Sequence, residues 1–100
     1  MKLEQSHTLG KDEARRRIER LANYWSTNYG VGVNWNGDSA RFVGTVKGIS
    51  FDAVLTISEK QVNAEGNDPG FLMRAIVTGY LKKKIATYLD PSVRPEDIVE

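Results

Sequence analysis

Few side chains in this 100-residue sequence are of the types that catalyse reactions or bind metals. His7 is the single histidine, and no nucleophile or orienting carboxylate accompanies it in a recognisable motif. A metal site would lack its usual nitrogen and sulfur ligands, because the chain has no cysteine and no second histidine. We therefore expect no catalytic residue, no metal and no cofactor, and we expect His7 to be hydrogen-bonded or solvated in an N-terminal arm.

Two carboxylates, Asp52 and Glu65, are expected on the same polar face of a sheet, where they could bind a cation or transfer a proton. Nothing in the surrounding pattern suggests a cleft, and the glycines show no phosphate-binding spacing. A solvated sheet surface is the preferred interpretation, and an enzyme is the least favoured class.

Basic residues cluster in the segment EARRRIER, residues 13–20. Acidic partners at helical spacing would neutralise part of this charge. The expected pairs are Asp12–Arg16, Glu13–Arg17 and Arg15–Glu19. The chain has 14 lysines and arginines against 13 acidic residues, whereas nucleic-acid-binding domains usually show a clear basic excess. The cluster therefore indicates a salt-bridged solvent face, and we expect no nucleic-acid partner.

The last apolar segment carries two stripes at helical spacing. The first, a core stripe, contains Met73, Val77, Leu81, Ile85 and Tyr88. The second contains Leu72, Ile76 and Tyr80, with Lys83 in line with it. An apolar stripe beside lysines could contact a hydrophobic particle, an anionic lipid surface or a second copy of the chain. It could equally belong to one broad stripe that rotates as the helix curves, or be covered by the N-terminal arm through Leu3 and Leu9. The candidate contact residues are Leu72, Ile76, Tyr80 and Lys83.

Apolar periodicity predicts the elements that position these residues. Helices are expected over 11–29 and 69–89, the first ended by Gly30 and the second started by Asp68 and Pro69. Alternation predicts four strands, over 31–35, 40–46, 49–57 and 61–66. The expected fold class is a two-layer α+β domain, helix–four-stranded antiparallel meander–helix, with both helices on one face. Residues 1–90 would form the single domain and 91–100 a flexible C-terminal tail that adds little to the core.

Three expected hairpins agree on one register. Loops at 36–39, 47–48 and 59–60 pair inward residues with inward residues in every case. The key pairs are Trp35–Ala40, Val33–Phe42, Val46–Ile49, Gly44–Phe51, Phe42–Ala53, Ala40–Leu55, Leu55–Ala64 and Ile57–Val62. One face of the sheet is therefore apolar and the other is polar. The N-terminus shows no signal peptide, and no apolar run approaches the roughly 20 residues that cross a bilayer, so we expect a cytoplasmic protein.

Several motifs resemble one known family. They are HTLGKDEARRRIERLA at 7–22, YG at 29–30, W.GD at 35–38, RF.G.V.G at 41–48 and GFL at 70–72. Together they are similar to the small polyhydroxyalkanoic acid system proteins of Gram-negative bacteria. The resemblance implies a link to polyester storage, in synthesis, use or at the granule surface, and it implies no catalytic residues. Gly10 stands where a polar helix cap is expected in the family.

Three hypotheses from different classes follow. The leading one is a non-enzymatic cytoplasmic accessory protein of polyhydroxyalkanoate storage that binds a granule surface or a granule-associated protein. The second is a small carrier of an acyl or lipid-like ligand, with a cavity between helices and sheet left by small inward residues. Those residues are Ala40, Gly44, Ala53, Ala64 and Gly66. The third is a homodimerising interaction module that pairs through the open sheet face or the strand edges.

Overall fold

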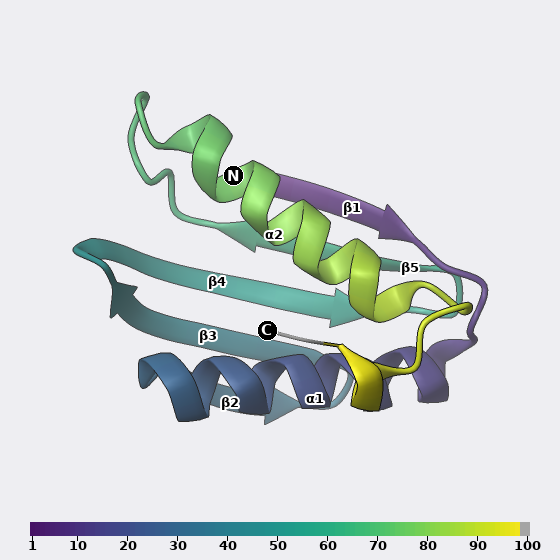
Figure 1. Ribbon diagram of the computed structural model, residues 1–100. Coiled ribbons are helices and arrows are strands. Elements are labelled where there is room, and N and C mark those ends of the chain that lie inside the picture. The colour runs from purple at the N-terminus through teal and green to yellow at the C-terminus, as the bar shows by residue number, and fades with distance from the viewer. Residues whose placement is uncertain (99–100) are drawn as a thin grey trace.

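The computed structural model describes residues 1–98 as helices packed on one antiparallel sheet (Figure 1). In chain order the elements are β1 (Lys2–Ser6), α1 (Lys11–Tyr29), β2 (Gly32–Asn36), β3 (Ser39–Val46), β4 (Ile49–Ile57), β5 (Gln61–Gly66), α2 (Arg74–Leu89) and the 3₁₀ turn η1 (Pro95–Asp97). The sheet order is β1-β5-β4-β3-β2. The α+β class is confirmed, but the sheet has five strands and not the four that we predicted.

The predicted register is confirmed in all three hairpins. Phe42 pairs with Ala53 and Gly44 with Phe51 across β3 and β4, around the two-residue turn at Lys47 and Gly48. The same agreement holds between β4 and β5 and between β2 and β3. The β2–β3 turn is shorter than expected, because Asn36 pairs with Ser39. Alternating burial along β3, β4 and β5 places the apolar residues of these strands on one face.

The fifth strand, β1, lies in the segment that we expected to be an arm. It runs antiparallel to β5, with Leu3 opposite Ala64 and Lys2 opposite Glu65. Its sequence, KLEQS, contains one apolar residue, so it lacks the alternation that identifies a half-buried strand. Leu3 nevertheless packs against the core. The charged residues suit an edge strand, because they discourage pairing with another chain.

Both helices cover the apolar face of the sheet, but they diverge along it. Figure 1 shows α1 over the β2–β3 side and α2 running diagonally above β1 and β5. They come together at the N-terminal end of α1 and the C-terminal end of α2, and they separate toward the opposite ends. Trp25 of α1 packs edge-on against Phe42 at a centroid distance of 5.5 Å. The N-terminal arm does not cover the outer side of α2, since Leu3 lies in the sheet.

Helix α2 begins at Arg74, five positions later than we predicted. Gly70 has a φ of +104°, which is incompatible with an α-helix. The Asp68 carboxylate accepts a hydrogen bond from the Gly70 N–H at 2.9 Å and forms an ion pair with Arg74. Asp68 therefore stabilises a turn before the helix, and residues 69–73 present their side chains from that turn.

The segment after α2 contributes more to the core than we expected. Pro95 is buried and Ile98 packs against the core cluster. Glu96 lies 3.4 Å from the Arg16 guanidinium of α1. The flexibility of residues 91–100 stays a prediction. The expectation that this tail adds little to the core is wrong for Pro95 and Ile98.

Gly79 offers a direct test of the backbone freedom in α2. It lies within the helix, and a Cβ at this position would meet no atom within 4 Å. Glycine within a helix costs about 0.5–1 kcal/mol relative to alanine, because the unfolded chain loses more conformational freedom. We expect Gly79→Ala to raise the free energy of unfolding by about that amount in urea titrations monitored by circular dichroism. A loss of stability would show that α2 does not have this helical geometry.

Candidate functional site

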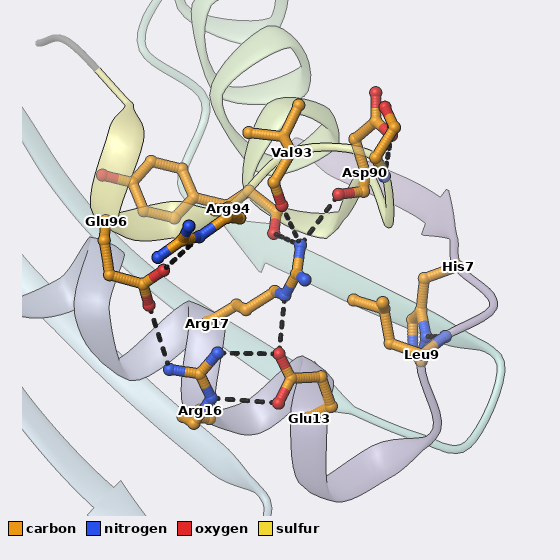
Figure 2. Close-up of polar contacts among 11 residues, drawn as sticks. His7, Leu9, Glu13, Arg16, Arg17, Asp90, Val93, Arg94 and Glu96 are labelled. Atoms are coloured by element: carbon orange, nitrogen blue, oxygen red, sulfur yellow. Dashed lines mark hydrogen bonds and ion pairs between the residues drawn. The ribbon is translucent and has the colours of Figure 1, made fainter.

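His7 has a structural environment. Its side chain is buried, Nδ1 accepts a hydrogen bond from the Leu9 N–H at 3.2 Å, and Nε2 lies 3.0 Å from the Ser58 carbonyl. Because Nδ1 accepts a hydrogen bond, the proton of the neutral ring is on Nε2, and Nε2 donates a hydrogen bond to the Ser58 carbonyl. This arrangement corresponds to one neutral tautomer. Figure 2 shows the ring folded back beside Leu9, between β1 and the start of α1. The hydrogen-bonded interpretation is confirmed, and His7 ties the chain to the β4–β5 turn.

Arg17 is the charged residue that the sequence analysis placed wrongly. We expected the arginine cluster to face solvent, but Arg17 is only 8% exposed. Its guanidinium donates to the carbonyl oxygens of Tyr88, Asp90 and Val93 at 3.3, 2.8 and 2.9 Å. On the other side it donates to Glu13 at 2.8 Å, as Figure 2 shows. One side chain of α1 thus binds carbonyl oxygens at and just beyond the C-terminal end of α2, where a helix does not supply its last carbonyls with partners of its own.

A carboxylate supports this cluster from the first turn of α1. Glu13 accepts hydrogen bonds from Arg16 and Arg17, and these bonds lower the pKa of Glu13 to about 2. The predicted Glu13–Arg17 and Arg15–Glu19 pairs are confirmed. The predicted Asp12–Arg16 pair is not found, because Arg16 binds Glu13 and Glu96 instead. The cluster lies at the end where the two helices meet, and its charged side chains bind one another.

The two acidic residues expected on the open sheet face each bind a basic neighbour. Asp52 forms an ion pair with Arg41 at 2.6 Å, and this contact lowers the pKa of the Asp52 carboxyl. Glu65 lies 3.6 Å from Lys2. Within residues 1–98 no three histidine or acidic side chains gather in a way that could hold a metal ion. The open sheet face is polar, with the hydroxyl pairs Ser39–Thr56 and Thr45–Ser50 across neighbouring strands.

An apolar cavity of about 320 Å³, partly open to solvent, lies between the separated ends of the helices. Trp25 and Tyr29 of α1 lie on one side, and Val77 and Leu81 of α2 lie on the other. The floor is the apolar face of the sheet. Its lining residues there are Phe42, Val46, Ile49, Phe51, Ala53, Leu55 and Ala64. Ala53 and Ala64 are two of the small inward residues that we expected to leave space, and the sequence could not show where that space would collect.

Large apolar side chains are exposed on the outer side of the same end of α2. Leu72 is 83% exposed, Ile76 64% and Tyr80 43%, so all three predicted contact residues of the second stripe reach solvent. Phe71, which the sequence analysis did not single out, is also 83% exposed. Lys83 is exposed further along the helix. We call Phe71, Leu72, Ile76 and Tyr80 the outer patch.

The outer patch is continuous with the cavity. Ile76 and Tyr80 belong to the patch and also line the cavity. The Tyr80 hydroxyl accepts a hydrogen bond from the Trp25 indole N–H at 3.3 Å, which links α2 to α1 beside the opening. Lys84 lies over the rings of Tyr24 and Tyr80, at 5.5 and 5.9 Å from their centroids. Of the three adjacent lysines, Lys82 and Lys83 face solvent and Lys84 is half-buried.

With this geometry established, the sequence can be compared with known families. Residues 1–93 match the family described as "putative polyhydroxyalkanoic acid system protein". The chain belongs to this family. The match covers every helix and strand except η1, so the fold described above is the family's domain in this chain. No curated protein and no solved structure matches the sequence.

Family membership agrees with an accessory role in polyhydroxyalkanoate storage. Helices in the described part of the chain are too short or too polar to span a bilayer. The outer patch holds the large apolar side chains with the highest exposure in the described part of the chain.

Proposed function

We propose that this protein is a non-enzymatic accessory protein that binds the surface of polyester storage granules through the outer patch. The observation that carries the proposal is the pair Phe71 and Leu72, adjacent large apolar residues that are each 83% exposed. Contiguous apolar side chains of this size on a soluble domain mark interaction sites more often than isolated ones do. The family description supplies the kind of partner, a polyhydroxyalkanoic acid system.

The geometry of the outer patch suits a flat apolar surface. Phe71 and Leu72 project from the turn before α2, and Ile76 and Tyr80 continue along the helix. Lys82 and Lys83 are exposed beside this row and can contact anionic groups at the rim of the contact. The opposite face of the molecule offers a weaker alternative, because Val43 and Val54 are isolated among charged and hydroxyl side chains.

A co-sedimentation assay with amorphous poly(3-hydroxybutyrate) particles tests the proposal. We expect Phe71→Lys with Leu72→Lys to weaken particle binding at least tenfold, since each side chain contributes about 1.5–3 kcal/mol when fully removed from water and a surface contact removes only part of it. The fold should be unaffected, because neither side chain packs against the core.

The matched control is Val43→Lys with Val54→Lys, which adds the same two charges to the open sheet face. This control should bind particles as well as the parent protein does. If the outer-patch variant sediments with particles like the parent, or if the control loses binding equally, the outer patch is not the contact surface.

A further inference from the structure

The cavity beneath α2 is too large to be a packing defect. Interiors of folded domains are close-packed, and voids larger than a water molecule are few. The cavity measures about 320 Å³. A water molecule takes about 30 Å³ in the liquid, so this volume holds about ten non-hydrogen atoms. It also reaches the lower end of the range of roughly 300–1,000 Å³ typical of small-molecule sites.

The lining is mostly apolar, and its polar side chains are Lys47, Asn67 and the two tyrosines Tyr29 and Tyr80. The N-terminal ammonium group of Met1, which also lines the cavity, donates a hydrogen bond to the Gly66 carbonyl at 2.9 Å. Trp25, Phe51 and Val77 are typical of its walls, and hydrocarbon surrounds most of the space. Lys47 is the one charged side chain in the lining. It lies in the β3–β4 turn with a φ of +51°, followed by Gly48 at +80°, so the turn holds it at the end of the sheet. Across residues 1–98, no acidic side chain forms an ion pair with Lys47.

We propose that this cavity binds a single medium-chain alkanoate of about eight to ten carbons, with its hydrocarbon between the helices and its carboxylate at Lys47. The volume limits the length of the chain, the apolar walls exclude a polar body, and the unpaired ammonium group selects an anionic head. The proposal goes beyond granule binding, because it concerns the inner side of α2, whereas the outer patch contacts the granule.

The fold explains why the site can open. The bonds of Arg17 fix the end where the helices meet, and the buried residues of α2, namely Ile85, Tyr88 and Leu89, all lie toward that end. The first half of α2 has no fully buried side chain and contains Gly79. Tyr80 bridges to Trp25 across the opening through one hydrogen bond. The cavity is already partly open to solvent, and movement of the weakly packed half of α2 would widen it for a ligand.

Isothermal titration of the full chain with decanoate tests the proposal, with decan-1-ol as a ligand of equal length and no charge. We expect decanoate to bind with a dissociation constant below 1 mM. Val77→Phe should weaken binding at least tenfold, because the added ring occupies the cavity. Lys47→Gln should weaken decanoate binding several-fold and leave decan-1-ol binding within twofold, since only the acid has a charge to lose.

Controls separate the cavity from general surface binding. Val43→Phe adds an aromatic ring to the open sheet face and should leave decanoate affinity unchanged. If Val77→Phe does not fold by circular dichroism, Ala53→Val narrows the cavity from the sheet side and takes its place. Absence of decanoate binding at 1 mM, or equal affinity in the folded cavity variants, overturns the proposal.

The same titrations distinguish this proposal from granule binding. Phe71→Lys with Leu72→Lys should keep decanoate affinity within twofold, because neither residue lines the cavity. The carboxyl end of a polyester chain shares the chemistry of a free alkanoate, so a linear oligomer of 3-hydroxybutyrate forms a second arm. Tighter binding of the oligomer than of decanoate assigns the site to polymer ends, and the reverse order assigns it to free acids.

Discussion

Replacing Arg17 by methionine is expected to lower the free energy of unfolding by about 3 kcal/mol or more. Methionine keeps much of the apolar stem but removes the guanidinium that binds the Glu13 carboxylate and three carbonyl oxygens at and just beyond the end of α2. A buried acceptor that loses its donor costs about 1–3 kcal/mol, and the Asp90 carbonyl costs least because it also accepts a hydrogen bond from the Val93 N–H. Urea titrations monitored by tryptophan fluorescence and by circular dichroism measure the loss.

The neighbouring arginine is the matched control. Arg16 also binds Glu13, but its guanidinium is exposed, and its hydrogen bonds within residues 1–98 go to the side chains of Glu13 and Glu96. Exposed ion pairs contribute about 0–1 kcal/mol, so Arg16→Met should cost no more than that. Equal losses in the two variants would show that Arg17 acts as an ordinary surface charge and does not fasten α2 to α1.

The part of the fold that repeats with a strict period could be predicted from the sequence. Strands β3 and β4 alternate apolar and polar residues except at Val43 and Val54, and a shift of one residue would expose the inward side chains of an entire strand. The two-residue turn at Lys47 and Gly48 leaves one pairing that keeps Phe42 inward. Helix α1 has the same property at the helical period, and its bounds match the predicted 11–29.

Elements defined by their partners could not be predicted in the same way. Strand β1 pairs with β5 across more than fifty residues of sequence, and its single apolar residue, Leu3, gives no period. The start of α2 depends on whether Asp68 caps a helix or a turn, and the positive φ of Gly70 decides for the turn. Arg17 is buried because α2 ends directly above it. The spacing of residues 13–20 carries no information about where α2 ends.

The candidate site likewise has features that the sequence predicts and features that it does not. A helical wheel placed Leu72, Ile76 and Tyr80 on a second stripe, and for Ile76 and Tyr80, which lie in α2, exposure depends mainly on angle. Phe71 and Leu72 both precede the helix, where a wheel gives no information about exposure. The cavity depends on the angle between the helices, and side-chain periodicity does not specify that angle.

The Arg17 contacts, the cavity and the outer patch all depend on how α1 and α2 are placed. Arg17 holds α1 and α2 together at one end, while the diverging ends leave the cavity inside and the outer patch outside. Packing density is therefore unequal along α2, with full burial at Ile85, Tyr88 and Leu89 and exposure before Gly79. Segments with few buried contacts open most readily, so exchange of amide hydrogens in α2 should be fastest toward its start.

Gly66→Ala is expected to destabilise the protein by about 2 kcal/mol, because the sheet leaves no room for a side chain at the end of β5. A Cβ at this position would lie 2.9 Å from the Ala53 Cβ and 3.0 Å from the Asp52 carbonyl oxygen. Backbone and Cβ atoms cannot rotate away, and inserting one carbon into a packed site typically costs about 1–3 kcal/mol. The same substitution at Gly79, where space is open within a helix, should stabilise the protein, so the two variants should change stability in opposite directions.

A double variant identifies the contact that is responsible. Ala53→Gly removes the nearest atom, so Ala53→Gly with Gly66→Ala should be more stable than the sum of the two single changes predicts. The coupling should be about 1 kcal/mol and not the full loss, since the Asp52 carbonyl oxygen stays in place. Strictly additive effects would mean that β5 moves to accommodate the new methyl group. Close packing between residues 53 and 66 would then not explain the loss of stability.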